Sequence, residues 1–318
     1  MTHLRVSIVT PSLNRRRFLE RAIRSVAEQG YPNVEHIVVD GGSTDGTLEL
    51  LGDAAERYGV RWISEADDGM YQAINKGLAM ATGDVLAYLN TDDLYFPWSV
   101  EIAASSLAEH PDVDAIYGDL AHLDTETGRG GLRLYPPFRR GYLVRSAFIG
   151  QPTVFWRRRI LLQMGGFDER LRYVADCDYW MRAGRQFRFL KLDEVMAIDG
   201  VHAETLRTTH AAAVFAELRS VRVRNGAAQG RRGLALRVLD LMYYALHTQA
   251  AFARLMVEWA RHRVFSRRPR RWCRFLESDA RISGFRLLLC LIPDRRRRLG
   301  HGVVTWQPSA ARRARVSS

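Results

Sequence analysis

The fold is decided by the stretch VLAYLNTDD, residues 85–93, in which an apolar run ends in two adjacent carboxylates. Such an unbroken run, followed by polar residues and Pro97, predicts a strand that is buried on both faces. Ligands of open α/β sheets bind just beyond the carboxyl ends of the strands. Asp92 and Asp93 would repel each other there unless a cation lies beside them, and Mg²⁺ carrying phosphate groups suits such a pair. The structural alternative is that both aspartates cap the helix that begins near Pro97.

Strand and helix patterns alternate along the chain up to this run. The expected strands are residues 6–10, 34–39, 60–64 and 85–89, and the segments between them carry apolar residues at helical spacing. This order predicts an α/β fold with a mostly parallel sheet built from right-handed βαβ units. The strand ends would bring Thr10, Asp40, the loop 65–68 and Asp92 to one edge of the sheet. Helix capping explains one acidic strand end, but it does not explain three.

Two familiar phosphate-binding loops are absent from these strand ends. The loop at residues 11–14 lacks the glycine fingerprint of a dinucleotide-binding fold, and Gly41-Gly42 is not followed by the Gly-Lys-Ser/Thr of a P-loop. A nucleotidyltransferase with a similar sheet is a competing hypothesis. It would need a basic, glycine-rich loop at residues 11–14, and that loop is neither.

The chain of 318 residues carries a net charge of +12, which suggests a polyanionic partner. Nucleic acid, an anionic membrane surface and phosphorylated substrates are the candidates. A non-enzymatic nucleic-acid binder would carry a recognisable reading module, and we find none, so we expect no nucleic-acid partner. The three cysteines show no metal-type spacing and suit a reducing cytosol, and residues 4–10 read as a strand rather than as a signal peptide.

After Trp98 the pattern changes. We expect, in order, a helix to about Glu109, a short strand at 115–118, a turn at 124–131, an irregular basic segment at 132–150, an extended segment at 151–156 and a short helix at 160–164. Asp176 and Asp178 then open a helix with an apolar face. A carboxylate at such a position can complement the helix dipole or act as a general base toward a hydroxyl, and the residues alone leave both interpretations open.

Six segments of the chain follow one another in a specific order. They are SIVTP at 7–11 with Asn14, VVDGGSTDGT at 38–47, DGMYQAINKG at 68–77, Gly83-Asp84 leading to LNTDD at 89–93, GGFD at 165–168, and DCDYWMR at 176–182. In these segments the chain resembles the family 2 glycosyltransferases over roughly residues 4–205. The resemblance implies a GT-A fold and an inverting enzyme that depends on Mg²⁺ or Mn²⁺. It implies a nucleotide-diphosphate-sugar donor and a saccharide or polyprenyl-phosphate-linked acceptor, in cell-envelope or exported polysaccharide synthesis.

The resemblance also implies roles for single residues. The donor nucleotide sugar would contact Thr10, Pro11, Asn14, Asp40, Asp67, Asn75, Lys76, Asn90, Thr91 and Asp92, with Asp40 reading the edge of the base. The metal would bind Asp92, the last residue of the family's Asp-x-Asp motif, and Asp93. Asp176 falls where the family keeps its catalytic base. The chain departs from the pattern at Asn90, which occupies the first Asp position of the metal motif, and at Ala175, where an acid usually precedes the base.

His202 and three further residues complete the expected site. Many GT-A enzymes place a late histidine on the metal, which makes His202 a candidate ligand, and the alternative is a loop histidine that supports a lid. Asp178, Trp156 and Gln151 are assigned to the acceptor side. Trp156, with Phe155 and Trp180, would form either a wall that stacks on a sugar or part of the core.

Residues 208–318 are expected to form a basic, helical extension beyond a catalytic domain of residues 1–207. Helices are expected at 210–225 and 234–259, and charged residues interrupt the second, so we expect no transmembrane span. Arginine clusters beside apolar pieces from Arg261 onward suit an anionic membrane surface, and the alternative is packing on the catalytic domain. We expect a cytoplasmic protein, or one held at the inner face of the plasma membrane, with a disordered end at 312–318.

Overall fold

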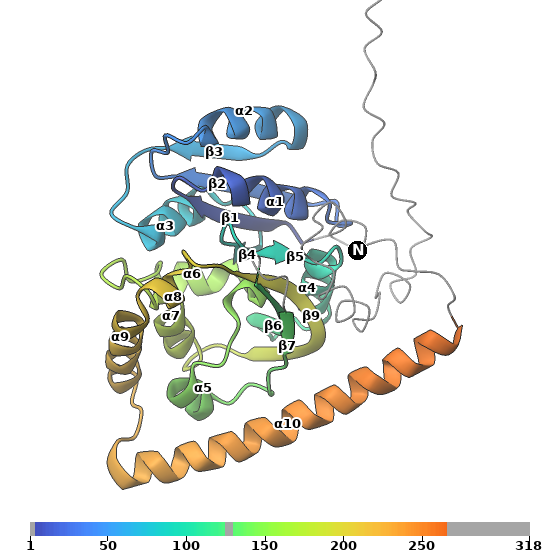
Figure 1. Cartoon of the computed structure of the whole chain (residues 1–318), viewed down its shortest axis with the longest axis vertical. Helices are drawn as coiled ribbons and strands as arrows, with labels where there is room; N and C mark the ends of the chain where they lie inside the picture. Colours follow the sequence, from blue (N-terminus) through green and yellow to red (C-terminus); the bar gives the residue numbers. More distant parts are fainter. Residues whose placement is uncertain (1–3, 125–129, 266–318) are drawn as a thin grey trace, which may run out of the picture.

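The computed structural model describes residues 4–124 and 130–265 of the chain. The first half consists of β1 (Val6–Ser12), α1 (Arg16–Ala27), β2 (Val34–Asp40), α2 (Thr47–Tyr58), β3 (Arg61–Ser64), α3 (Met70–Met80) and β4 (Val85–Tyr88). The second half adds β5 (Leu94–Tyr95), α4 (Ser99–Glu109), β6 (Ala115–Asp124), β7 (Gly130–Arg133), α5 (Arg140–Ser146), the 3₁₀ helix η1 (Gln151–Thr153), β8 (Phe155–Arg157), α6 (Arg158–Met164), α7 (Ala175–Ala183) and β9 (Phe189–Val201). Three helices follow: α8 (Leu206–Thr209), α9 (Ala211–Arg224) and α10 (Gly230–Phe265). Figure 1 shows α2 at one end of the molecule and α10 along the opposite end.

One sheet runs through the molecule in the order β3-β2-β1-β4-β8-β6-β9-β5, and β7 pairs with β6. β1 lies between β2 and β4 and is parallel to both, and β3 is parallel to β2. The predicted α/β fold with parallel βαβ units is therefore confirmed. Every residue of β1 and of β4 is buried, because helices cover both faces of this half of the sheet.

The other half of the sheet is mixed. β8 runs antiparallel to β4 and β6, β5 runs antiparallel to β9, and β6 is parallel to β9. The strands β5, β7 and β9 and the helix α5 were not predicted, and β6 extends beyond the predicted end at residue 118 to Asp124. The extended segment expected at 151–156 is a 3₁₀ turn followed by the short strand β8.

The capping alternative for Asp92 and Asp93 is wrong. The residue before α4 is Trp98, and no side chain caps the N-terminus of this helix. Both aspartates instead lie in the loop directly after β4, at the carboxyl edge of the sheet. Their presence at this edge therefore needs an explanation other than helix capping.

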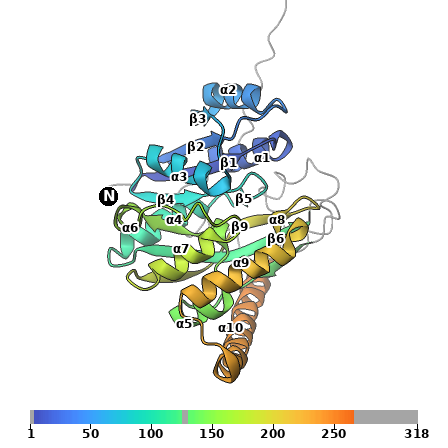
Figure 2. The ribbon, with the colours of Figure 1, turned by 90° about the vertical axis from the view of Figure 1, so that its left-hand side faces the viewer.

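The last helices attach to the body at separate points. Val221 of α9 is 1% exposed and belongs to the main core, and the Asn225 amide donates to Asp178 of α7 at 2.9 Å. α10 is held by Asp240, which accepts two hydrogen bonds from Arg145 of α5. Figure 2 shows α9 alongside α7 and α10 projecting below them. A domain boundary at 207/208 stays a prediction, since α9 packs as part of the main body.

Within residues 4–124 and 130–265, no helix has the length and apolarity that crossing a bilayer requires. The arginine clusters from Arg267 onward and the expected disordered end at 312–318 lie outside the described residues.

Candidate active site

The loops after β1 and β2 are tied to each other at the carboxyl edge of the sheet. The Asn14 backbone N–H donates to the Ser43 hydroxyl at 2.7 Å, and the Thr44 N–H donates to Asn14 Oδ1 at 2.8 Å. Asn14 adopts a φ of 51°, a left-handed conformation that asparagine tolerates better than most residues. Asn14 thus shapes this loop pair, and its contact with a donor stays a prediction.

Asp40 lies at the end of β2 and is fully buried. Its Oδ2 accepts hydrogen bonds from the N–H groups of Gly42 (3.0 Å) and Ser43 (2.8 Å) and from the Ser64 hydroxyl (2.7 Å). The carboxylate therefore organises the glycine-rich loop. Reading the edge of a base would require this loop to open, because the structure leaves no Asp40 atom exposed.

The loops after β2 and β3 also meet. A Cβ added to Gly41 would lie 2.7 Å from Asp67 Oδ2, so a larger residue would have to displace the Asp67 carboxylate. Lys76 pairs with Glu65 at 2.8 Å and donates to the Ala66 carbonyl at 2.9 Å, which fixes the same loop from α3. Asp67 and Lys76 are thereby held next to the Asp40 loop.

Thr10 and Pro11 lie inside β1 and are buried. The Thr10 hydroxyl is 2.9 Å from His36 Nε2, and burial lowers the pKa of His36 to about 3, so the ring is neutral. The structure directs the Thr10 hydroxyl to His36 rather than to the open edge of the sheet. A donor contact through this side chain is not supported by its position.

Asp92 and His202 face each other across the end of the sheet. His202 Nε2 lies 3.2 Å from Asp92 Oδ2, and the imidazole stacks on Phe18 with ring centroids 4.5 Å apart. The His202 side chain is 2% exposed, whereas the Asp92 side chain is 23% exposed. The Glu204 N–H donates to His202 Nδ1 at 3.3 Å. Because Nδ1 accepts this hydrogen bond, Nε2 carries the proton in the neutral ring and donates to Asp92.

Gly200 makes this pairing possible. A Cβ at residue 200 would lie 2.2 Å from the backbone oxygen of Asp92, so any side chain would push β9 away from the loop after β4. The Gly200 N–H also donates to Asp93 Oδ1 at 3.2 Å. The close approach of the two strand ends brings Asp92 to His202.

The Asp93 side chain is buried in the protein. It is 3% exposed, and besides Gly200 it accepts a hydrogen bond from the Asn90 amide at 3.3 Å. Burial, and then the charges of Asp92 and Asp199, raise the pKa of Asp93 well above its ordinary value. Both oxygens of Asp93 serve internal hydrogen bonds, and the metal role predicted for Asp93 stays a prediction. Asn90 holds Asp93 in place, and Thr91 is nearly buried.

Asp176, in the first turn of α7, accepts a hydrogen bond from the Tyr71 hydroxyl at 3.1 Å. Burial raises the pKa of Asp176 above its ordinary value, although the Cys177 backbone N–H, Tyr71 and the Arg207 cation act in the opposite direction. Burial and then the charge of Asp176 raise the pKa of Tyr88 well above its ordinary value, and Asp93 adds to this effect. Tyr88 therefore lies within electrostatic reach of Asp176 in α7 and of Asp93 in the loop after β4.

Three acceptor-side candidates lie away from any open surface. Trp156 is fully buried and meets Trp180 edge to face at 5.1 Å, so it belongs to the core, and its position rules out stacking on a sugar here. Asp178 is 1% exposed in its side chain and pairs with Arg182 (2.7 Å) and Arg224 (2.8 Å). The Gln151 amide donates to the Tyr88 carbonyl at 2.7 Å and so holds the last residue of β4 in place. None of the three contacts the Asp92–His202 pair.

Asn75 has a structural role that the sequence did not reveal. Its amide donates to the Phe167 carbonyl at 2.9 Å and to Glu169 at 2.7 Å, and its Oδ1 accepts the Phe167 N–H at 2.9 Å. Asn75 therefore fixes the loop that precedes α7 and Asp176.

Sequence reasoning missed three residues at the site. Arg207 of α8 binds both oxygens of Asp199 at 2.7 and 2.6 Å. Burial lowers the pKa of Arg207, but Asp199 and then Asp93 raise it above its ordinary value. Glu217 of α9 accepts three backbone N–H groups, from residues 172–174, directly before the α7 turn. Tyr71 lay inside a quoted motif, whereas Arg207 and Glu217 carry no sequence signal because only the fold brings α8 and α9 here.

A complete metal site is not present in protein atoms alone. Across the residues that the structure describes, no three His, Cys, Asp or Glu side chains gather closely enough to hold a metal ion. Asp92 and His202 offer two ligands, and Mg²⁺ and Mn²⁺ sites that serve nucleotides commonly draw further ligands from the phosphates. The pair therefore fits a cation that arrives with a diphosphate.

Comparisons with known proteins show the family and the fold of the chain. The family model for glycosyl transferase family 2 matches residues 7–165. A "PGL/p-HBAD biosynthesis glycosyltransferase" of Mycobacterium bovis is 34% identical over 179 residues, which is 55% of this chain and 68% of that protein. An uncharacterized glycosyltransferase of Mycobacterium tuberculosis is 32% identical over 181 residues, 56% of this chain and 68% of the relative.

Solved structures show the same fold. TarS of S. aureus, in complex with UDP-GlcNAc, superposes with a TM-score of 0.58 at 20% identity and covers 71% of this chain and 68% of its own. The mannosyltransferase PcManGT of Pyrobaculum calidifontis, in complex with GDP-Man and Mn²⁺, gives a TM-score of 0.56 at 18% identity, over 92% of this chain and 86% of its own. The fold is therefore of the GT-A type. The chain belongs to glycosyl transferase family 2 and is a glycosyltransferase.

Proposed function

We propose that this glycosyltransferase is metal-dependent and inverting, and that it moves a sugar from a nucleotide-diphosphate sugar to a hydroxyl of a saccharide or lipid-linked acceptor. The observation that carries the proposal is the Asp92–His202 pair at the carboxyl edge of the sheet, with its 3.2 Å separation. Asp176 of α7 supports the proposal, because the charges of Asp176 and of Asp93, the neighbour of Asp92, both raise the pKa of Tyr88 at the end of β4.

Asp92 and His202 would hold the cation, Mg²⁺ or Mn²⁺. When bound, the cation supplies a positive charge that stabilises the negative charge developing on the departing diphosphate. For Nε2 of His202 to become a ligand, its proton must move to Nδ1, which would release the long 3.3 Å contact with the Glu204 N–H. Arg207 adds a permanent positive charge to this part of the protein, and its two hydrogen bonds to Asp199 fix the orientation of the guanidinium group.

Asp176 would act as the general base toward the acceptor hydroxyl. An alcohol is a weak nucleophile unless a base takes its proton as the new bond forms. The raised pKa of Asp176 makes its carboxylate a stronger base than an exposed aspartate, and the Tyr71 hydroxyl holds the carboxylate in position. Since one base on one face of the sugar requires no covalent intermediate, the expected stereochemical result is inversion.

The relatives support a nucleotide-sugar donor and a biosynthetic role. The mycobacterial relative is named for PGL/p-HBAD biosynthesis, and the structural neighbours were solved with UDP-GlcNAc or GDP-Man. By extension, we place the present enzyme in cell-envelope or exported polysaccharide synthesis, on the cytoplasmic side of the plasma membrane. The net charge of +12 suits phosphate-bearing donors, acceptors and lipids.

A thermal-shift screen of UDP- and GDP-sugars with Mn²⁺ tests this proposal. A ligand that binds only the folded protein raises the melting temperature with its concentration, so a true donor identifies base and sugar together. The expected result is one donor that stabilises the protein in Mn²⁺ and stabilises it much less in EDTA. Failure of every nucleotide sugar to stabilise the protein would contradict the proposal.

A further inference from the structure

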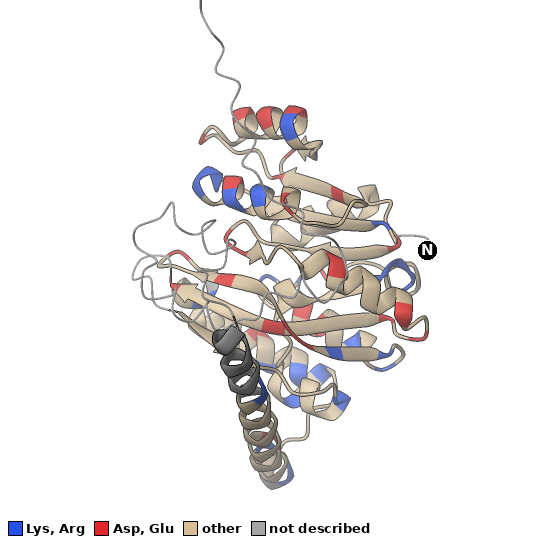
Figure 3. Cartoon of the chain, turned by 90° about the vertical axis from the view of Figure 1, so that its right-hand side faces the viewer, with Lys and Arg blue, Asp and Glu red and all other residues tan. Residues whose placement is uncertain are grey.

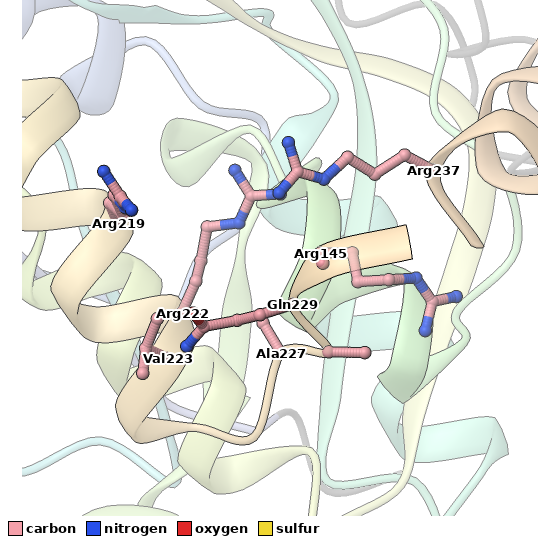
Figure 4. A pocket seen from close by; sticks show the side chains of 9 residues that line it. Arg145, Arg219, Arg222, Val223, Ala227, Gln229 and Arg237 are labelled. Atoms are coloured by element: carbon pink, nitrogen blue, oxygen red, sulfur yellow. The ribbon is translucent and has the colours of Figure 1, made fainter. Parts of the chain in front are cut away.

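A cavity lies where α5, α9 and the beginning of α10 meet, and its lining includes neither Asp92 nor His202. It measures about 430 Å³, and four of the nine residues that line it are arginines. These are Arg145, Arg219, Arg222 and Arg237. Figure 4 shows them entering from three different elements. We call this cavity the arginine pocket.

The four arginines differ in how they are neutralised. Arg145 donates to both oxygens of Asp240, at 2.5 and 2.7 Å, so this carboxylate is already used. Arg222 donates to the Val144 carbonyl at 3.3 Å. Within the described part of the chain, neither Arg219 nor Arg237 makes a hydrogen bond or an ion pair.

Two of these cations face each other. Figure 4 shows the side chains of Arg222 and Arg237 pointing toward one another across the pocket. Burial lowers the pKa of Arg222, and the charge of Arg237 lowers it further, whereas Asp240 and the Cys177 thiol act in the opposite direction. Like charges held this close are unfavourable unless an anion lies between them, and guanidinium groups bind phosphate oxygens in pairs.

The same end of the molecule presents an apolar surface. Six apolar side chains of α10 are at least half exposed: Leu234, Val238, Leu239, Leu241, Met242 and Leu246. Asp240 is buried, and Tyr243 packs on the core from the opposite side of the helix. The exposed positions recur every three or four residues, so they form one face. Figure 3 shows basic residues along this same helix, and the sequence makes all of them arginines.

We propose that α10 rests on a membrane surface and that the arginine pocket takes the phosphate group of an anionic phospholipid. Charge and apolarity both favour this partner. An interfacial helix buries its apolar face at the headgroup boundary while its cations bind lipid phosphates. A free phosphate or nucleotide would explain the arginines, but it would leave the apolar face of α10 exposed to water. The rest of the sequence after Arg261 is rich in arginine, which favours the same charged surface.

This proposal rests on the membrane location proposed above and names the surface that would contact the lipid. Lipid binding requires neither donor nor turnover, so the lipid-binding proposal can fail while the proposed glycosyl transfer holds. Sedimentation of the full-length protein with sucrose-loaded vesicles measures the binding. The vesicles are pure phosphatidylcholine or phosphatidylcholine with 30% phosphatidylglycerol. The pocket variant Arg219→Gln/Arg237→Gln is compared with Arg57→Gln/Arg172→Gln, which removes the same charge from exposed positions outside the pocket.

The expected result is binding of the wild type to the anionic vesicles, with about tenfold weaker binding of the pocket variant than of the control variant. Leu241→Gln/Leu246→Gln should weaken binding, whereas Leu162→Gln, an exposed leucine of α6, should not. Equal binding of the pocket and control variants would overturn the proposal. Two other results would also overturn it. In the first, inorganic phosphate stabilises the wild type but the wild type does not bind vesicles. In the second, the pocket variant loses binding to duplex DNA but keeps binding to vesicles.

Discussion

At Asp176, burial and hydrogen bonding oppose each other, and burial prevails. The carboxyl group has a raised pKa and accepts a hydrogen bond from Tyr71. A general base must be deprotonated, so turnover should fall as the pH drops through this raised pKa, at a higher pH than for an ordinary aspartate. The acidic limb of the kcat profile checks this direction.

Replacing the carboxylate tests its role. Asp176→Asn keeps the shape and the contact with Tyr71 but cannot accept a proton, so turnover should fall by about two to four orders of magnitude. Donor binding, measured by thermal shift, should survive. Wild-type turnover in this variant would remove Asp176 from the chemistry.

His36 predicts a pH-dependent stability that is independent of catalysis. The ring has a pKa of about 3 in the folded protein, whereas an unfolded histidine titrates near its ordinary value of 6.5. Below pH 6.5 the unfolded chain therefore binds a proton that the folded protein refuses, and stability falls as the pH falls toward 3. At pH 5 the loss is about 2 kcal/mol.

His36→Gln should remove this part of the acid sensitivity, because glutamine can still pair with the Thr10 hydroxyl but cannot titrate. Urea unfolding at pH 7.5 and pH 5 measures the difference in the free energy of unfolding. The variant should lose less stability between the two pH values than the wild type. An unchanged pH dependence would show that His36 titrates normally.

The sequence could predict some of these residues and not others. Asp92 and Asp176 are assigned to the site by the order of the motifs along the chain, and His202 is assigned by the late histidine of many GT-A enzymes. Asp93 is adjacent to Asp92 in sequence, yet it turns inward to the Gly200 N–H and the Asn90 amide. The direction of a side chain depends on partners from distant elements, and β9 was not anticipated at all.

Among the elements, α3 shows how closely helices pack on this sheet. A Cβ at Gly77 would lie 2.4 Å from a methyl group of Val9 and 3.1 Å from one of Val39. Gly77→Ala should therefore push α3 off β1 and β2 and destabilise the protein by about 1–3 kcal/mol. Gly52, in α2, has open space at its Cβ. Gly52→Ala should stabilise the protein by about 0.5–1 kcal/mol, because alanine favours a helix.

Urea unfolding of both variants provides the measurement, and each serves as the control for the other. Opposite signs are expected. A neutral effect of Gly77→Ala would mean that α3 can shift without cost, and the tight packing inferred from the structure would be wrong.

The parallel half of the sheet could be read from the sequence, because its strands are continuous apolar runs separated by helical spacing. β9 could not be read in this way. Lys191 and Asp193 interrupt its apolar pattern, and the charge of Lys191 is neutralised only in the folded protein, by the buried Asp119 at 2.8 Å. Such a pair joins β6 to β9 and leaves no local signal in either segment.

On the scale of the whole molecule, the chain combines a GT-A body with a basic helical end. α9 is part of the body, because Glu217 holds the loop before α7 and Val221 lies in the core. α10 is tied to the body through Asp240 but exposes an apolar face. The candidate active-site edge and the arginine pocket lie on different elements, and we propose a nucleotide sugar for the first and a membrane lipid for the second.

The account depends on Asp92 and His202 acting together on a metal-bound nucleotide. Calorimetric titration of UDP and GDP into the full-length protein, with Mn²⁺ and with EDTA, tests this most directly. We expect Mn²⁺ to raise the affinity of one nucleotide by at least about tenfold, and Asp92→Asn to abolish this gain. Asp53→Asn, at an exposed position of α2, should retain it. The same nucleotide affinity with and without Mn²⁺ in the wild type, or an undiminished Mn²⁺ effect in Asp92→Asn, would contradict the account.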